Sequence, residues 1–534
     1  MFASAVHRAR ALSPGESVAV AACALFVVVM VAALAGRGPG ALLYAVVLPL
    51  AAWAVASTRE RPMTPVESQA LGLSGLVAGA VAFAVLADSF ALYLALAPIV
   101  LVAGVAIVRF PVPSILLTFV FTGVFGTFQA YIGLPSAAFV DLLLACLWGG
   151  TIVAWLAGAR HHAAWLWPGI VAFAIYIVIT GFGVLMADIP RVGLESFRAS
   201  TWYMAAALLI AFSPLTERQR GLILRGILVV ALAVGSYASL RWVIGPSGAE
   251  QEFAYLSFNN FLDGELRTIG SFPTAKQLAA WTATVVPFLF AASLGLRGAW
   301  RLVAIAAVGA CTIGMLAPDV RAAPAAAVPG CALVLVLFAA SPAFGVRRIA
   351  ITLVAAALAV GGAVGGFALT LGDKSDTGNR YEAILNPTSD ASYQARLFKW
   401  DKALSDIDDH PLGHGMGTAG RSQSFFGRFY NIASFDIDNS YLKVGYEQGT
   451  AIMVFFGLSM LLMLLGLSRR AAASRRVAAA LPMMGAAGSL LAIAILYFVG
   501  TYIEDLNALT GWIIVGLGLA AATWRVAPDE PETA

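Results

Sequence analysis

Four arginines stand at the edges of strongly apolar segments, where a permanent positive charge needs a partner. They occur in ESFRASTWYM, ELRTIGSFPT, PDVRAAPAAA and SYQARLFKWD as Arg198, Arg267, Arg321 and Arg396, with Arg191 and Lys276 nearby. A guanidinium offers a planar fork of donors that matches phosphate oxygens in pairs. Contact with phospholipid headgroups is the alternative for any one of them. Together they favour binding of a lipid-linked phosphate or pyrophosphate, whose developing charge they would stabilise as it leaves.

A carboxylate begins another apolar segment. The stretch DIDNSYLKVGYEQGT places Asp438 and Asn439 at its start. A carboxylate at the N-terminus of a helix is favoured by the helix dipole, so Asp438 could be a cap. Alternatively, Asp438 is a general base that takes a proton from an attacking sugar hydroxyl, with Asn439 contacting the substrate beside it.

Two further patterns could bind ligands. The stretch HPLGHGMGTAG predicts a flexible turn and not a nucleotide-binding loop, because no strand precedes it and no helix directly follows. His414 within it is a candidate donor to a ligand. The Asp-x-Asp pairs Asp406/Asp408 and Asp436/Asp438 could hold a divalent cation or lie in solvent, and we favour solvent.

The elements that must position these residues are membrane helices. The chain has 534 residues, of which 60% are hydrophobic and 12% charged, and its mean hydropathy is +0.85. A soluble domain has about 25% charged residues. This composition excludes a cytosolic enzyme, a nucleic-acid-binding protein and a disordered scaffold. The expected fold is an all-α polytopic membrane protein with about 14–16 transmembrane helices.

The apolar segments also predict an orientation. They lie near residues 18–36, 40–57, 67–87, 90–108, 113–131, 138–157, 164–186, 198–214, 222–243, 276–296, 301–317, 325–342, 349–371, 441–467, 478–499 and 509–524. Alternate connections are basic, as with Arg297 and Arg301, which indicates that they and both termini are cytoplasmic. The connections 187–197, 244–275 and 372–440 then lie outside.

The longest outer connection, 372–440, is too long for a simple linker and should have structure of its own. Leu397, Trp400, Leu404 and Ile407 recur in it at helical spacing, which predicts an amphipathic helix on the membrane surface or above a cavity. We therefore divide the chain into N-terminal helices 1–163, core helices 164–371, the outer loop 372–440 and C-terminal helices 441–534.

These motifs, in this order, resemble those of the O-antigen ligase and O-antigen/exopolysaccharide polymerase family of bacterial envelope enzymes. The resemblance runs from about Arg191 to Gly457. It is carried by ESFRA, RTIGSFPTAKQLA, DVRAAPA, the Arg396-x-x-x-Trp400 pair before HPLGHGMG, and DNSYLKVGYEQG.

The resemblance implies a GT-C-like membrane glycosyltransferase on the outer (periplasmic) face of the cell inner membrane. Its donor would be a glycan on undecaprenyl pyrophosphate, its acceptor a sugar hydroxyl, and its reaction would need no metal or cofactor. Family arginines bind the pyrophosphate, a role that carries over to Arg198, Arg267, Arg321 and Arg396. The implied partners are the bilayer, the acceptor glycan and other glycan-assembly proteins such as a chain-length regulator, without nucleic acid.

Three functions fit the resemblance differently. Family ligases have a histidine at the position of Asp438, so the aspartate favours a polymerase that extends lipid-linked repeats. A ligase that passes the finished glycan to lipid A-core or another acceptor is the alternative. A lipid-glycan flippase is less consistent, because a transport path normally places ionisable residues deep in the spans, whereas here they gather at one face.

Overall fold

The structure is a computed structural model, and its described part is almost entirely helical. It describes residues 111–132, 140, 144, 168–213, 215–257, 260–262, 264–345, 391–420, 437–504 and 506–523. The chain divides into two compact units. The first comprises Met1–Arg160 and Ser213–Val230, and the second comprises His161–Phe212 and Ala231–Ala534.

The first unit contains α6 (Pro111–Ile132) and the first half of α11 (Glu217–Ile244). Proline suits the first position of α6, because its φ is already helical and no N–H is needed there. Gly226 of α11 lies against the side chain of Leu116, so closely that a Cβ at Gly226 would overlap with it. The segment predicted near 113–131 is therefore a packed helix.

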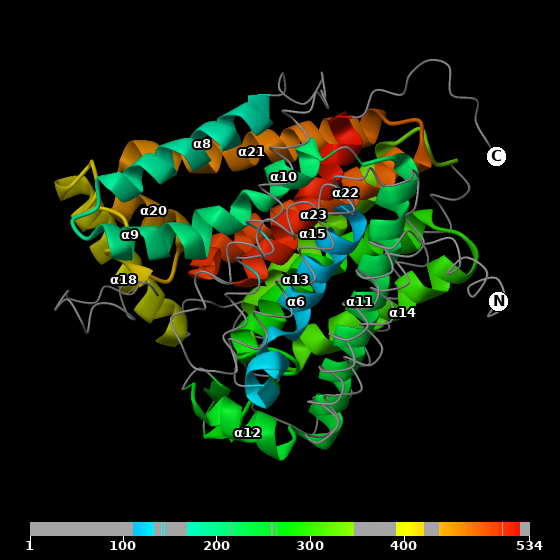
Figure 1. Cartoon of the computed structure of the whole chain (residues 1–534), viewed down its shortest axis with the longest axis horizontal. Helices are drawn as coiled ribbons and strands as arrows, with labels where there is room; N and C mark the ends of the chain where they lie inside the picture. Colours follow the sequence, from blue (N-terminus) through cyan, green and yellow to red (C-terminus); the bar gives the residue numbers. More distant parts are fainter. Residues whose placement is uncertain are drawn as a thin grey trace, which may run out of the picture. The chain divides into compact units, whose positions relative to one another are not determined.

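The described part of the second unit consists of helices, which Figure 1 labels, and one small hairpin. Besides the second half of α11, its elements are α8 (Pro168–Leu185), α9 (Pro190–Phe197), the π-helical turn η2 (Arg198–Trp202), α10 (Ala206–Phe212), α12 (Gly248–Tyr255), β1 (Phe261–Leu262), β2 (Glu265–Leu266), α13 (Ala275–Gly295), α14 (Gly298–Leu316), α15 (Ala322–Ala340), α18 (Ala391–Asp409), α20 (Ser440–Gln448), α21 (Thr450–Ala473), α22 (Val477–Val499), the 3₁₀ turn η5 (Tyr502–Glu504) and α23 (Leu506–Thr523). The two strands pair antiparallel, with Phe261 opposite Leu266.

Two long helices form the centre of the second unit. In its most apolar 18-residue stretch, α13 is 94% buried and α22 is 78% buried, against 28–39% for α8, α14, α15 and α21. Small residues let these helices approach closely: a Cβ at Gly330 of α15 would lie 2.6 Å from the carbonyl oxygen of Gly488 of α22. The outer helices thus expose apolar surface, as expected where lipid surrounds them.

The all-α membrane fold is confirmed. Within the described residues, seven helices are long and apolar enough to cross a membrane. The segments predicted near 164–186, 222–243, 276–296, 301–317, 325–342, 478–499 and 509–524 are each a single helix. Those near 18–36, 40–57, 67–87, 90–108 and 349–371, and most of 138–157, lie outside the described residues.

Two predicted spans are interrupted. The segment near 441–467 is two helices, because Gly449 between α20 and α21 has a φ of +93° that ends the first. The segment near 198–214 begins with the π-helical turn η2 and continues as the short α10. The second interruption begins at the candidate site residue Arg198, and π-helical turns are frequent at functional sites.

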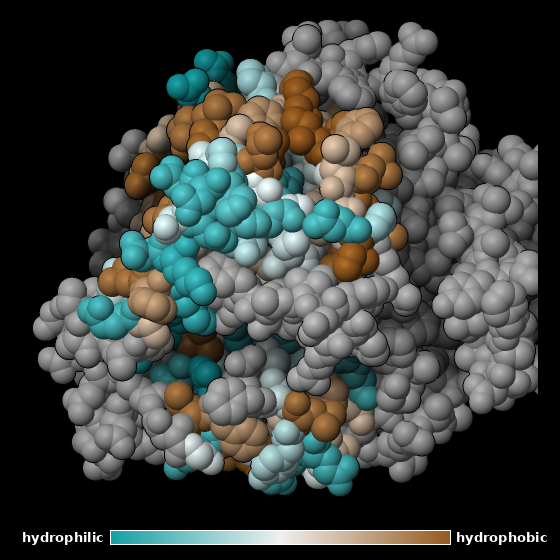
Figure 2. Space-filling view, turned by 90° about the vertical axis from the view of Figure 1, so that its left-hand side faces the viewer, coloured by the Kyte–Doolittle hydropathy of each residue, from teal (hydrophilic) through white to brown (hydrophobic). Residues whose placement is uncertain are grey.

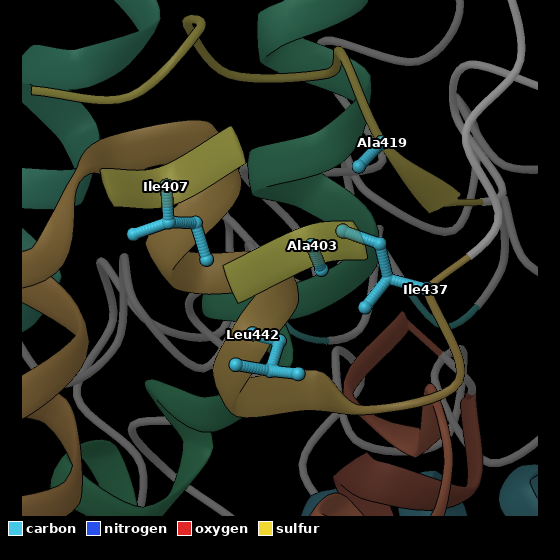
Figure 3. Packing of buried hydrophobic residues seen from close by; sticks show 5 residues of the cluster. All are labelled: Ala403, Ile407, Ala419, Ile437 and Leu442. Atoms are coloured by element: carbon cyan, nitrogen blue, oxygen red, sulfur yellow. The ribbon is translucent and has the colours of Figure 1, made fainter. Parts of the chain in front are cut away.

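The amphipathic helix of the outer loop is present as α18, but its buried face differs from the predicted one. Leu404 is 51% exposed and Leu397 is 36% exposed. Ala403 is buried instead, because α18 turns that side toward α20 and the segments flanking residues 421–436. Figure 3 shows the resulting cluster of Ala403, Ile407, Ala419, Ile437 and Leu442, against which Trp400, Tyr446 and Met453 pack.

Candidate functional site

A chain of contacts places several candidate residues at one end of the second unit. Arg267, before α13, bonds to the turn between α14 and α15. Lys276, at the start of α13, lies 4.6 Å from the ring centre of Tyr502 in η5. The hydroxyl of Ser440, which begins α20, donates to the carbonyl of Gly500 at 2.8 Å. The ends of α13, α14, α20 and α22 therefore meet here.

Figure 1 shows α9, α18 and α20 side by side at the left of the view. Figure 2 looks onto that side, where hydrophilic residues gather in a patch below an area of hydrophobic ones. Because polar side chains are costly inside a bilayer, such a patch is expected where a membrane protein meets water or a polar ligand.

Asp438 is held at this end by α18. Its Oδ2 lies 3.5 Å from Nζ of Lys399, and its backbone carbonyl accepts a hydrogen bond from Trp400 Nε1 at 3.1 Å. The side chains of Asp438 and Lys399 are 29% and 35% exposed, so a ligand can approach the pair. The ring of Trp400 meets Phe498 edge-on at 5.2 Å, which fixes α18 to the end of α22.

The helix cap is Asn439 and not Asp438. Asn439 Oδ1 accepts from the backbone amides of Tyr441 at 2.9 Å and Leu442 at 3.0 Å. Its Nδ2 donates to the carbonyl of Phe498 at 2.9 Å, and the residue is 3% exposed. The expectation that Asn439 contacts a substrate is therefore less consistent with its geometry than a capping role is. The Asp438 carboxylate is not used for capping and is directed to Lys399.

Arg267 and Arg321 meet at the turn between α14 and α15. Arg267 Nε donates to the carbonyl of Pro318 at 2.7 Å and its Nη2 to that of Asp319 at 2.8 Å. Asp319 has a φ of +52°, an unfavourable conformation for a residue with a side chain. Arg321, half-buried, is the N-cap residue of α15 two positions later. Arg267 thus supports the backbone that presents Arg321.

The other cationic candidates stand on separate elements. Arg198 opens η2 and forms a bidentate pair with Glu195 of α9, in which Nε lies 2.8 Å from Oε2. Arg191 lies in α9. Arg396 is half-buried on α18, one turn before Lys399. The contacts between η2 and η5 bring Arg198 to the same end as Lys276.

The glycine segment after α18 is bound tightly to α20 and is not the simple flexible turn that we expected. Gly413, Gly415, Gly417 and Gly420 all have φ between +78° and +94°. The amide of His414 donates to the Tyr446 carbonyl at 2.8 Å, and that of Gly415 donates to the Glu447 carbonyl at 2.9 Å. These glycines are needed because only they adopt this backbone freely.

His414 faces α18 and not Asp438. Its Nε2 lies 3.1 Å from Oδ2 of Asp406, and its ring packs at a tilt against that of Tyr446, with the ring centres 4.4 Å apart. Burial and the neighbouring Asp406 raise the pKa of Tyr446 to about 12, so its hydroxyl stays protonated at neutral pH. His414 is therefore part of the contact between α18 and α20.

A buried ionic cluster underlies this end, and the sequence analysis missed it. Lys443 Nζ lies 2.6 Å from Glu447 Oε2 and 3.3 Å from Glu504 Oε1, and all three side chains are 2–3% exposed. Ser196 Oγ accepts from Lys443 at 3.1 Å, while Gly417 donates its backbone N–H to Glu447 at 3.0 Å. The cluster therefore joins α9, the glycine segment, α20 and η5.

The cluster perturbs the ionisation of its members. Burial lowers the pKa of Lys443, but Glu447 and Glu504 outweigh this and raise it above the ordinary lysine value. The pKa of Glu447 is raised, mainly by burial. The positive charge of Lys443 lowers this pKa, whereas the second carboxylate, Glu504, raises it because both carboxylates share one ammonium group. The lysine and glutamate four residues apart, directly before an apolar helix, were the available sequence signal.

Replacing Gly417 with alanine is expected to destabilise the protein by roughly 2–3 kcal/mol, from backbone strain plus overpacking. A Cβ there would lie 2.7 Å from the carbonyl oxygen of Val192. Gly415→Ala is the matched control, because its φ is similarly positive but its nearest neighbour, Ala187 Cα, lies 3.8 Å away. Thermal unfolding in detergent should show a clearly larger loss for Gly417→Ala. Equal losses would contradict the packing argument.

Replacing Arg267 with alanine is expected to lower, indirectly, any activity that depends on Arg321. The carbonyls of Pro318 and Asp319 would lose their charged donor, and the strained turn that presents Arg321 would relax. Loss of a hydrogen bond to a charged group costs about 1.5–3 kcal/mol, so a lower unfolding temperature should accompany the lower activity. Arg321→Ala is the comparison: for a similar loss of activity, its unfolding temperature should fall less than that of Arg267→Ala.

Comparison with known proteins places a family domain on this part of the chain. Residues 306–456 match the family model described as O-antigen ligase. The match includes Arg321, Arg396, His414 and Asp438, and ends within α21. A search of curated proteins found no match.

Proposed function

We propose that this chain is a membrane glycosyltransferase that polymerises polyprenyl-pyrophosphate-linked oligosaccharide repeats. The match of residues 306–456 supports its assignment to the O-antigen ligase/polymerase family. The observation that supports this most is the position of Asp438. Its carboxylate is partly exposed, is oriented by Lys399, and lies at the end of the unit where the arginine-bearing turns meet.

In the proposed reaction, Asp438 accepts the proton of an acceptor-sugar hydroxyl as its oxygen attacks the anomeric carbon of the donor glycan. A new glycosidic bond forms while the bond from the anomeric carbon to the pyrophosphate oxygen breaks. The bonding electrons leave with the pyrophosphate. Attack opposite the leaving group inverts the anomeric configuration in the simplest case. Lys399 holds the carboxylate in position.

Permanently charged groups would take up the charge on the leaving pyrophosphate. Arg321 is proposed as the main contact, with Arg267 as the residue that positions its turn. Arg198, Arg396, Arg191 and Lys276 are proposed to bind the remaining phosphate oxygens or the glycan. Such donors act best when fixed before the reaction, and the pairing of Arg198 with Glu195 meets that requirement.

The reactive end is proposed to face away from the cytoplasm, on the outer side of the inner membrane, with both chain termini inside. The opposite end of the second unit supports this orientation. Arg297 and Arg301 lie there, where α13 ends and α14 begins, and Arg469, Arg470, Arg475 and Arg476 lie where α21 ends and α22 begins. Basic residues favour the cytoplasmic side.

Incubation of the purified protein in liposomes with one undecaprenyl-pyrophosphate-linked repeat tests the proposal. A polymerase should convert this single substrate into a ladder of longer lipid-linked chains and release undecaprenyl pyrophosphate. A ligase remains the second candidate, since the matched family model is described as O-antigen ligase. It should give no product until lipid A-core or another acceptor is added. Absence of transfer in both reactions would overturn the assignment.

A further inference from the structure

Three potential metal ligands meet where α18 ends. Asp406 and His410 stand four residues apart on one face of the helix terminus, with Nδ1 of His410 3.8 Å from Oδ1 of Asp406. His414 approaches from the glycine segment, with its Nε2 3.1 Å from Oδ2 of Asp406. One ligand atom from each of the three residues lies within 4.8 Å of the others.

The backbone around these residues is firmly held. Gly413 donates to the His410 carbonyl at 2.8 Å, and Thr450 donates to the Pro411 carbonyl at 3.0 Å. The ring of His414 packs against those of His410 and Tyr446, with ring centres 4.3 Å and 4.4 Å apart. His414 therefore reaches Asp406 from a fixed direction, while the side chains of Asp406 and His410 are partly exposed and accessible to an ion from solution.

We propose that Asp406, His410 and His414 bind one divalent transition-metal ion of the Zn²⁺ class, which fastens the end of α18 to the glycine segment. Two imidazoles and one carboxylate are a ligand set that Zn²⁺ accepts, whereas Mg²⁺ and Ca²⁺ take oxygen ligands. With Zn–N and Zn–O distances of about 2.0–2.2 Å, tetrahedral geometry separates ligand atoms by roughly 3.3 Å. The distances from the Asp406 oxygens to His414 and His410, 3.1 Å and 3.8 Å, are close to this value.

The site is separate from the proposed transfer chemistry. Asp406 follows Lys399 by seven residues, which is about 10 Å along the helix. The ion would have a structural role, because it would cross-link α18 to the glycine segment. The backbone amides of Gly417 and Ala419 in that segment donate to Glu447 of the buried cluster. Asp408, which the sequence pattern pairs with Asp406, is exposed and does not belong to this group of ligands, and neither does the exposed Asp409.

Metal binding by the full-length protein tests the inference. The protein, purified in detergent with a tag that contains no histidine and treated with a chelator, is titrated with Co²⁺ and then with Zn²⁺. We expect one equivalent of Co²⁺ to give the visible absorption of a low-symmetry complex, Zn²⁺ to displace it, and Mg²⁺ not to compete. Zn²⁺ should also raise the unfolding temperature, because an ion that binds only the folded state stabilises it.

Variants identify the ligands. His410→Ala and His414→Ala should each weaken Co²⁺ binding by at least about 10-fold. Asp409→Asn removes a neighbouring charge and should leave binding unchanged. His161→Ala combined with His162→Ala removes the other histidine pair of the sequence and should also leave it unchanged. No binding by the wild type, binding that survives in the His410→Ala/His414→Ala double variant, or loss only in the His161/His162 variant would overturn the proposal.

Discussion

Replacing Asp438 with asparagine is expected to lower the rate of glycan transfer by at least about 100-fold, because general-base catalysis typically contributes a factor of 10²–10⁴. Asparagine keeps the shape of the side chain but cannot accept the proton of the attacking hydroxyl. The carboxylate makes no capping bond, since Asn439 is the cap, and its pair with Lys399 is partly exposed. The unfolding temperature should therefore stay near the wild-type value.

Asn439→Ala is the informative control for this experiment. It removes the cap of α20 and should cost about 1 kcal/mol of stability, with only a modest loss of transfer. Asp401→Asn removes an exposed carboxylate from α18 and should change neither property. Initial rates of chain elongation and thermal unfolding, measured on the same preparations, separate the cases. Full activity in Asp438→Asn would refute Asp438 as the base. A loss of stability in Asp438→Asn as large as that in Asn439→Ala would assign Asp438 a structural role.

Replacing Lys443 with methionine is expected to destabilise the protein by about 3–5 kcal/mol, because removal of one partner leaves buried charge without compensation. Glu447 and Glu504 would then face each other at 2–3% exposure without the ammonium between them. The effect should appear as a large fall in unfolding temperature and in the yield of folded protein from the membrane. Lys402→Met, on the exposed side of α18, should change stability by less than about 0.5 kcal/mol.

The stability that Lys443→Met loses relative to wild type is expected to depend on pH. The pKa of Glu447 is raised, so the folded state binds this proton more tightly than the unfolded state, and the contribution of this group to stability falls as pH rises. Without Lys443 to oppose it, this shift increases. The deficit relative to wild type should therefore be smaller near pH 5 than near pH 8.

Neutral replacement of the whole cluster tests the electrostatic origin of this effect. The triple variant Lys443→Met, Glu447→Gln, Glu504→Gln removes the unpaired charges and should recover part of the lost stability. Its unfolding temperature should also show less dependence on pH than that of Lys443→Met. A triple variant that is less stable than Lys443→Met would show that packing or the hydrogen bonds to Glu447 matter more than charge.

The features of the candidate site that could be predicted from the sequence are local ones, and those that could not are contacts between distant elements. The position of α18 was predictable, because a helical spacing of apolar residues is a local property. Its buried side was not, since that depends on which element it meets: Ala403 packs against Ile437 and Leu442, whereas the larger Leu404 stays exposed. The placement of Arg267 before a span was also visible, but its partners, the carbonyls of Pro318 and Asp319, are 51 and 52 residues away.

The sequence by itself determined that this is a helical membrane protein and approximately where its described helices lie, because the cost of polar groups in lipid is imposed residue by residue along each segment. It also placed Lys276 and Arg321 at helix ends. Only the tertiary structure decided which charges meet. Lys443 contacts Ser196 across 247 residues and Glu504 across two complete spans, and Asp438 faces Lys399 because Asn439 takes the cap. Such pairs depend on how helices pack against one another, and the hydropathy of a segment carries no information about that.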